Sequence, residues 1–190
     1  MPRIALIAVD CQNDYLPEGP LGSPDSDRII EPLVEYATLA ADVVIVSRNL
    51  HPADHQSFAY PSKRPANCVK GTPGARIISD LAAIAAKPEN YVISKGLDGN
   101  REGFSAFEGG TLRPLESLED ILQREEVTHV AVGGYWLDGC VAQTAFDANA
   151  LGYSTAIEMT CTLPFPEYAH DSDQRKATFE RLARAGIPYV

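Results

Sequence analysis

The sequence predicts an α/β fold of three layers, in which a parallel sheet lies between two layers of helices. Short β-branched runs alternate with longer amphipathic stretches along the 190 residues. The apolar runs are continuous, which is typical of parallel strands that are buried on both faces. No Pro-, Gly- or Ser-rich linker and no repeat divides the chain, and its length can bury one proper core. We therefore expect residues 1–190 to form a single domain.

The elements follow from this alternation. Apolar runs predict strands at Ile4–Val9, Val43–Ser47, Tyr91–Ser94, His129–Gly133 and Ser154–Met159, with a short last strand at Pro188–Val190. Amphipathic stretches predict helices at Asp27–Ala41, Leu115–Arg124, Asp138–Leu151 and Ser172–Ala185, and one or two shorter helices within Gly74–Ala86. Strands that alternate with helices in this way pair in parallel.

Composition narrows the function classes. The formal net charge of -10 and the pI near 4.8 argue against nucleic acid or an anionic membrane as partner. The first apolar run, Arg3–Val9, is too short for a secretory signal, and no apolar run approaches the roughly 18 residues that span a bilayer. We expect a cytoplasmic protein. Its cysteines are scattered without CxxC pairing, which favours neither a disulfide framework nor a zinc-thiolate site.

Three polar residues stand at the carboxyl ends of predicted strands, where parallel sheets bind their ligands. Asp10 follows the first strand, Lys95 follows the third, and Cys140 lies a turn beyond the fourth, where a helix is expected to begin. The positive end of a helix favours a thiolate, a nearby carboxylate can act as base and acid, and a lysine keeps that carboxylate ionised. Taken singly, each could be a core cysteine, a turn-capping aspartate or a solvated lysine. Their joint placement predicts a nucleophilic site.

Five segments resemble those of the isochorismatase-like cysteine hydrolases, most closely the nicotinamidase and pyrazinamidase branch. They are Val9–Tyr15 (VDCQNDY), Ser47–His55 (SRNLHPADH), Asn67–Ala75 (NCVKGTPGA), Ser94–Gly96 (SKG) and Asp138–Ala145 (DGCVAQTA). The resemblance implies a six-stranded parallel sheet and a catalytic triad of Asp10, Lys95 and Cys140. It also implies a cis peptide bond between Tyr135 and Trp136, with the backbone N–H groups of Trp136 and Cys140 forming an oxyanion hole.

The resemblance implies hydrolysis of a small carboxamide, nicotinamide-like or carboxylate-bearing, to a carboxylic acid and ammonia. Cys140 would attack the carbonyl, Asp10 would carry the proton to the leaving ammonia, and water would release the thioester. Two other classes stay open on the same fold. One is a non-catalytic protein that binds a small molecule, and the other is a thiol redox sensor.

The chain departs from this family at the metal site. Nicotinamidases hold a divalent metal with one aspartate and three histidines, and the matching positions here are Asn49, His51, His55 and Asn67. Two imidazoles without a carboxylate make a weak donor set. We expect no cofactor, with zinc or iron at His51 and His55 as the alternative and a polar or loop role for both histidines otherwise.

The resemblance also places the substrate pocket. Tyr15 and Leu50 correspond to aromatic wall positions, Trp136 replaces a small residue, and Phe104 falls near a usual tyrosine. Arg64 could pair with a substrate carboxylate, and a solvated arginine is the alternative. Asn49 and Asn67 would donate to a ring nitrogen.

A small amide is the expected partner, and a homo-oligomer is a further expectation. Its candidate subunit contact is the apolar loop expected at Thr160–His170. Packing of that loop onto its own domain is the alternative.

Overall fold

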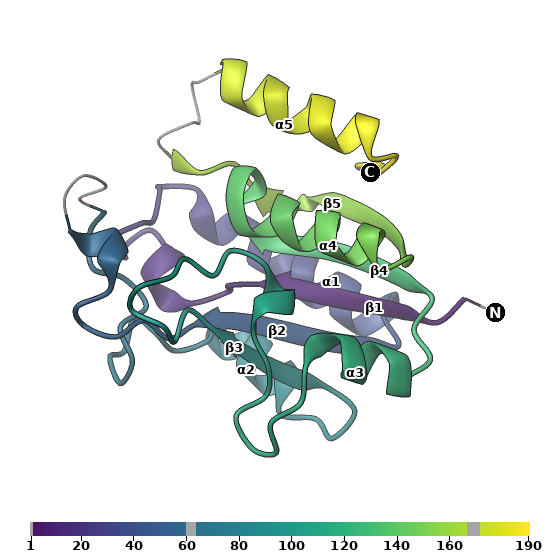
Figure 1. The fold of residues 1–190 in the computed structure, drawn as a ribbon, viewed down its shortest axis with the longest axis horizontal. Coiled ribbons are helices and arrows are strands. Elements are labelled where there is room, and N and C mark those ends of the chain that lie inside the picture. Colours follow the sequence, from purple (N-terminus) through teal and green to yellow (C-terminus); the bar gives the residue numbers. More distant parts are fainter. Residues whose placement is uncertain (1, 60–63, 167–171) are drawn as a thin grey trace.

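A parallel sheet forms the middle layer of the protein (Figure 1). The structure is a computed structural model that describes residues 2–59, 64–166 and 172–190. In these residues the sheet has five strands in the order β3-β2-β1-β4-β5, and every neighbouring pair is parallel. Their bounds are β1 Ile4–Val9, β2 Val43–Asn49, β3 Tyr91–Lys95, β4 His129–Tyr135 and β5 Ser154–Leu163. The predicted fold class is confirmed.

The strand count differs from the six that the resemblance implied. The expected last strand, Pro188–Val190, runs beside β5 and forms one parallel bridge, between Tyr189 and Ile157. The Ile157 N–H donates to the Pro188 carbonyl at 3.0 Å, and the Val190 N–H donates to the Ile157 carbonyl at 3.0 Å. Proline lacks an N–H for the ladder, which limits this short segment to a bridge.

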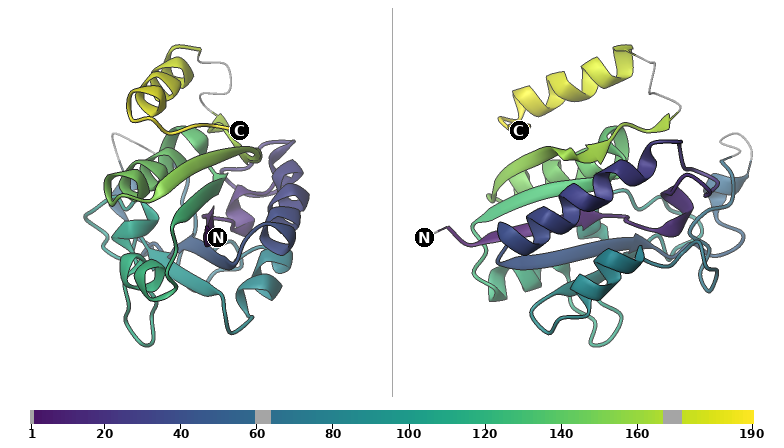
Figure 2. Two further views of the ribbon diagram at one scale, coloured as in Figure 1. Left: turned by 90° about the vertical axis from the view of Figure 1, so that its right-hand side faces the viewer. Right: turned by 180° about the vertical axis from the view of Figure 1, so that it is seen from behind.

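Helices cover both faces of the sheet (Figure 2). On one face, α1 (Ile30–Leu39) and α2 (Ser79–Ala85) bury their apolar sides against one set of strand residues, which includes Leu6 and Ala8. On the other face, α3 (Leu118–Arg124) and α4 (Ala142–Ala150) cover the alternate set, which includes Ile7. Helix α5 (Ser172–Arg184) contacts α4 beyond the β5 edge (Figure 1). No helix of the described residues is long and apolar enough to cross a membrane.

The helix expected around α4 and the loop expected after β5 differ from the sequence prediction, and α2 begins at Ser79 rather than at Gly74. The helix expected at Asp138–Leu151 is divided, because Gly139 has non-helical backbone angles and Leu137–Val141 forms a separate turn before α4. Cys140 therefore lies in a turn just ahead of the helix. The loop expected at Thr160–His170 begins as strand, since β5 continues to Leu163, and residues 167–170 lie outside the described residues.

Gly134 sets the close approach of β4 to the end of β1. Its φ of 113° is in the left-handed region, and a Cβ at this position would lie 2.1 Å from the carbonyl oxygen of Val9. No side chain fits between the two backbones, so glycine is required here. One residue further along, the peptide bond between Tyr135 and Trp136 is cis, as the resemblance implied.

We predict that Gly134→Ala lowers the free energy of unfolding by about 3 kcal/mol or more, because the new methyl group adds a backbone clash to an unfavourable φ. Gly152→Ala is the matched control, since Gly152 has a φ of 93° but a Cβ added there would meet nothing within 4 Å. That variant should lose about 1–2 kcal/mol, the effect of φ alone. Urea denaturation measures both, and equal losses would contradict the packing constraint.

Candidate active site

The strand order brings three polar side chains together at the carboxyl edge of the sheet. Lys95 ends β3 and pairs in register with Asn49, which ends β2. Asp10 follows β1 directly, on the other side of β2. Its φ of 54° places it in the left-handed region, which aspartate tolerates better than most residues. Because neighbouring strands are about 4.8 Å apart, the long Lys95 side chain reaches past Asn49 to Asp10.

Asp10 is fully buried and accepts hydrogen bonds on both carboxylate oxygens. Oδ1 accepts from the Ser47 hydroxyl at 2.8 Å. Oδ2 accepts from Asn49 Nδ2 at 2.9 Å and from Lys95 Nζ at 2.8 Å. These three contacts fix the position of the carboxylate.

Lys95 is buried, and its ammonium group is fully engaged. Nζ lies 2.8 Å from Asp10 Oδ2, 2.8 Å from Asn49 Oδ1 and 2.8 Å from the carbonyl oxygen of Gly103, and 3.5 Å from Cys140 Sγ. Burial lowers the pKa of Lys95, but the charge of Asp10, with a smaller contribution from Cys140, outweighs burial and raises it above its usual value. The side chain is therefore a permanent cation.

Cys140 is the third member of this cluster. It is partly accessible, and burial of the thiol, opposed by Lys95 and reinforced by Asp10, raises its pKa to about 12. The thiolate expected from the helix terminus is therefore not the resting form at neutral pH. A hydrogen bond with Asp10 adds to the rise. The site holds a neutral thiol beside an ion pair, and the carboxylate is in place to accept the thiol proton during attack on a substrate.

Sequence reasoning assigned no role to three groups that complete the cluster. Ser47 both donates to Asp10 Oδ1 and accepts from the Asp10 N–H at 3.0 Å. Gln12 binds the Asn49 backbone, and the Gly103 carbonyl accepts from Lys95. Ser47 carried a signal, as a polar residue that ends the apolar run of β2. The Gly103 carbonyl belongs to the backbone of a loop, so its role leaves no signal in the sequence.

The two candidate metal-binding histidines face each other with ring centroids 4.4 Å apart. His55 uses both nitrogens: Nε2 donates to the Arg101 carbonyl at 3.2 Å, and Nδ1 accepts from the Ser57 N–H at 3.2 Å. His51 Nδ1 donates to the Asn67 carbonyl at 2.9 Å. Burial lowers the pKa of His51, and the nearby His55 and Lys95 lower it further while the Asn67 carbonyl opposes them, so the ring is neutral at pH 7.

This donor set does not fit a zinc or iron ion. One imidazole lone pair is left, on His51, because both His55 nitrogens are engaged and the Asn49 oxygen already accepts from an ammonium group. The Asn67 amide donates to the Pro65 carbonyl at 2.9 Å. Among the described residues, no group of three or more His, Cys, Asp or Glu side chains is arranged to hold a metal. We therefore derive no chemical step through a metal.

The predicted wall residues lie at different depths. Tyr15, Leu50 and Trp136 are buried, and Tyr15 packs edge-on against Trp136 with ring centroids 5.8 Å apart. The Trp136 indole N–H is buried and has no hydrogen-bond partner among the described residues. Phe104 is 39% exposed. Arg64 lies 3.9 Å from the Glu102 carboxylate, so it already faces an anion.

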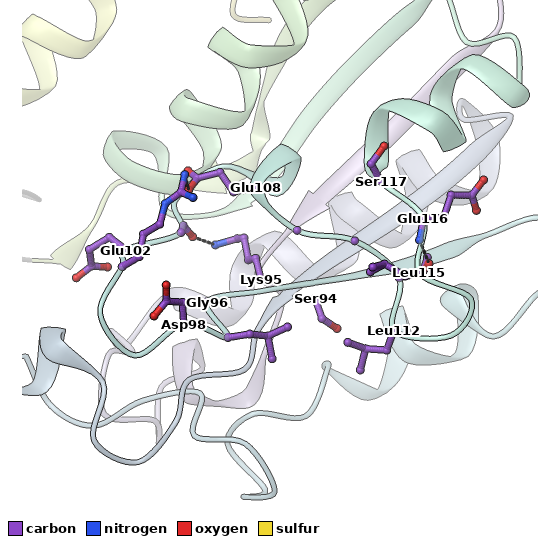
Figure 3. Close-up of a pocket in the computed structure, with 16 residues that line it drawn as sticks. Ser94, Lys95, Gly96, Asp98, Glu102, Glu108, Leu112, Leu115, Glu116 and Ser117 are labelled. Carbon is purple, nitrogen blue, oxygen red and sulfur yellow. Dashed lines mark hydrogen bonds and ion pairs between the residues drawn. The ribbon is translucent and has the colours of Figure 1, made fainter.

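A cavity of about 450 Å³ lies beside this cluster, between the end of β3 and the following loop (Figure 3). Lys95 and Gly103 border it, and Asp98, Glu102 and Glu108 make its wall acidic. The described residues that line it do not include Cys140. The cavity therefore adjoins the cluster without containing the thiol.

The sequence matches the model of the isochorismatase domain over residues 4–187. The chain belongs to the isochorismatase family. It is 32% identical to the nicotinamidase of Escherichia coli K12, over 83% of this chain and 81% of that protein. It is also 32% identical to the nicotinamidase/pyrazinamidase of Mycobacterium tuberculosis H37Rv, over 98% of this chain and 97% of that protein.

A solved structure gives the same assignment. The pyrazinamidase of Pyrococcus horikoshii, crystallised in complex with zinc, is 28% identical to this isochorismatase-family chain. It superposes with a TM-score of 0.80 over 100% of this chain and 99% of its own. The family predicted from the motifs is confirmed.

The Cys140 thiol should respond in opposite directions to loss of its two charged neighbours. Because the Asp10 charge raises the pKa of Cys140 and the Lys95 charge lowers it, Asp10→Asn should lower that pKa and Lys95→Met should raise it. We predict that the pH at which alkylation of Cys140 by iodoacetamide begins its steep rise, which marks formation of the thiolate, is about one pH unit lower in Asp10→Asn than in the wild type. In Lys95→Met this rise should begin about one pH unit higher.

Peptide mass mapping assigns the label to Cys140, and Cys140→Ser shows the background from the three buried cysteines. Changes of the same sign in both variants would show that the thiol does not lie between opposite charges.

Proposed function

We propose that the protein is a cysteine amidohydrolase, which cleaves the carbon–nitrogen bond of a small carboxamide to give a carboxylic acid and ammonia. One observation carries the proposal: the buried Asp10–Lys95 ion pair contacts the Cys140 thiol at the carboxyl edge of the sheet. A nucleophile beside a carboxylate and a fixed cation suits acyl transfer. The similarity to nicotinamidases supports amide hydrolysis, and the family match over residues 4–187 supports one catalytic domain.

Each residue of the cluster has its own role in the proposed reaction. Cys140 Sγ attacks the amide carbonyl while Asp10 accepts the thiol proton. Asp10 then returns this proton to the leaving nitrogen, and ammonia departs from a thioester. A water molecule, deprotonated by Asp10, hydrolyses the thioester and restores the thiol. Lys95 holds the Asp10 carboxylate in place and stabilises sulfur as negative charge develops on it, and the backbone N–H groups of Trp136 and Cys140 receive the oxyanion.

The predicted wall residues favour a nicotinamide-like substrate over a carboxylate-bearing one. Arg64 already faces Glu102, so a substrate carboxylate would have to compete with that ion pair. The indole N–H of Trp136 has no partner in the described part of the chain, and a buried donor of this kind is stabilised by an acceptor on a ligand. A ring nitrogen is such an acceptor. Both amide protons of Asn49 are already engaged, so Asn49 is not available for this role.

Removing the nucleophile should abolish turnover. We predict that Cys140→Ala lowers kcat for nicotinamide or pyrazinamide by several orders of magnitude while leaving the Tm within a few degrees, because an oxyanion hole without its nucleophile retains little catalysis. Ammonia release measures turnover, and mass spectrometry of the quenched wild type should show a thioester adduct on Cys140. Substantial ammonia release by Cys140→Ala would refute the covalent mechanism.

The same assay separates the other two function classes. A non-catalytic binding protein would bind an amide without releasing ammonia. A redox sensor would oxidise reversibly at Cys140, also without turnover. An amidohydrolase loses ammonia release when Cys140 is alkylated.

The donor set around His51 and His55 supports catalysis without a bound metal. We predict that protein purified without added metal contains much less than one equivalent of zinc or iron, and that EDTA leaves kcat unchanged. Elemental analysis and ammonia release before and after chelation measure both quantities. Near-stoichiometric metal, lost together with activity on chelation, would show that the histidines rearrange to form a site.

A further inference from the structure

Asn49 occupies the one position that the sheet places between the two charged groups of the site. It ends β2, next to Lys95 of β3 on one side and to the end of β1 on the other. Its side chain is 3% exposed. The side chain at position 49 therefore lies between Asp10 and Lys95.

The Asn49 side-chain amide joins these two groups. Its oxygen accepts from Lys95 Nζ at 2.8 Å, and its nitrogen donates to Asp10 Oδ2 at 2.9 Å. Lys95 also contacts Asp10 Oδ2 at 2.8 Å, so the three groups form a closed triangle. The reversed amide would turn its NH₂ toward the ammonium and its oxygen toward the carboxylate. The charges thus fix the amide orientation, and the amide in turn fixes the distance between them.

Neighbouring residues hold the amide in place. The second Nδ2 proton points to the Tyr15 hydroxyl oxygen, 3.1 Å away. The Asn49 backbone is held by Gln12, whose Oε1 accepts from the Asn49 N–H at 2.7 Å and whose Nε2 donates to the Asn49 carbonyl at 2.8 Å. Gly96 lies against the same side chain, where a Cβ would be 3.3 Å from Asn49 Oδ1 and 2.7 Å from His51. These contacts leave Asn49 one conformation.

We propose that Asn49 is a positioning residue of the catalytic cluster: its amide holds Asp10 and Lys95 in the arrangement in which the carboxylate faces the Cys140 thiol. Asn49 acts through these two groups and does not touch the reacting atoms. This rests on the proposed amide hydrolysis. The identity of the side chain matters because an amide can accept from a cation and donate to an anion at once, whereas a carboxylate can only accept.

The sharpest test is Asn49→Asp, which keeps the shape of the side chain and replaces the donor with an oxygen that faces Asp10. Two carboxylate oxygens at this distance repel each other, so Asp10 would move away from the position in which it faces the thiol. We expect kcat for the best amide substrate to fall about 100-fold with KM changed less than about threefold, because the base and cation are misplaced while the pocket wall is retained. EDTA in all assays removes any metal that the new carboxylate recruits.

Asn90→Asp is the matched control. Asn90 also uses its amide on both sides, accepting from the Val44 N–H at 2.8 Å and donating to the Ile84 carbonyl at 2.9 Å, at the start of β3 and away from the cluster. This variant should lose stability and keep the wild-type kcat. If Asn49→Asp lowered the Tm but left kcat within about threefold of the wild type, Asn49 would be a purely structural asparagine.

A second readout does not depend on turnover. Asn49→Asp adds negative charge near the Cys140 thiol, so iodoacetamide should label Cys140 several-fold more slowly than in the wild type at pH 8, while Asn90→Asp should leave the rate unchanged. If no amide were hydrolysed by the wild type, the proposed function would fail, and the labelling rates would still decide the placement of Asn49. Equal labelling rates in wild type and Asn49→Asp would overturn the proposal.

Discussion

The buried ion pair between Asp10 and Lys95 is the interaction on which the arrangement of the site depends. Moving a lysine and an aspartate out of water is unfavourable by several kcal/mol per ion unless each finds partners. Here the carboxylate accepts from Ser47, Asn49 and Lys95, and the ammonium donates to Asp10, Asn49 and Gly103. These partners come from the end of β2 and from the loop that follows β3. The pair therefore ties the ends of β1, β2 and β3 to the loop that follows β3.

The same pair sets the chemical state of the nucleophile. Cys140 lies 3.5 Å from the Lys95 ammonium, yet burial and the Asp10 charge raise the pKa of its thiol to about 12. A neutral thiol is protected from oxidation and from other reactions of a thiolate. In the proposed reaction, Cys140 becomes nucleophilic when the substrate enters and the Asp10 carboxylate accepts the thiol proton. The Lys95 ammonium then faces the developing thiolate, so the positive charge that stabilises the thiolate is already in place.

The sequence predicted the layers and the convergence of Asp10, Lys95 and Cys140 because both follow from hydrophobic periodicity and parallel pairing. It did not predict the polar extensions of β2 and β4, since Arg48, Asn49 and Tyr135 break the apolar pattern and are held in the strands by tertiary contacts. Gly139 interrupts the expected helix because its backbone angles are non-helical. Hydrophobic periodicity carries no information about these angles. The roles of Ser47, Gln12 and the Gly103 carbonyl depend on distances between segments remote in sequence, which spacing along the chain does not encode. The catalytic assignments themselves stay predictions.

A neutral side chain at position 49 keeps the buried charges of the site in balance. With a neutral amide at position 49 and a neutral thiol at Cys140, the buried charges of Asp10 and Lys95 cancel. A carboxylate at position 49 would leave one negative charge in excess, and a buried excess charge requires a further cation beside it. His51 and His55 instead donate to the backbone carbonyls of Asn67 and Arg101, which connects three loops above the sheet edge. With an amide at position 49 the site needs no second cation, and the two imidazoles hydrogen-bond to the loops.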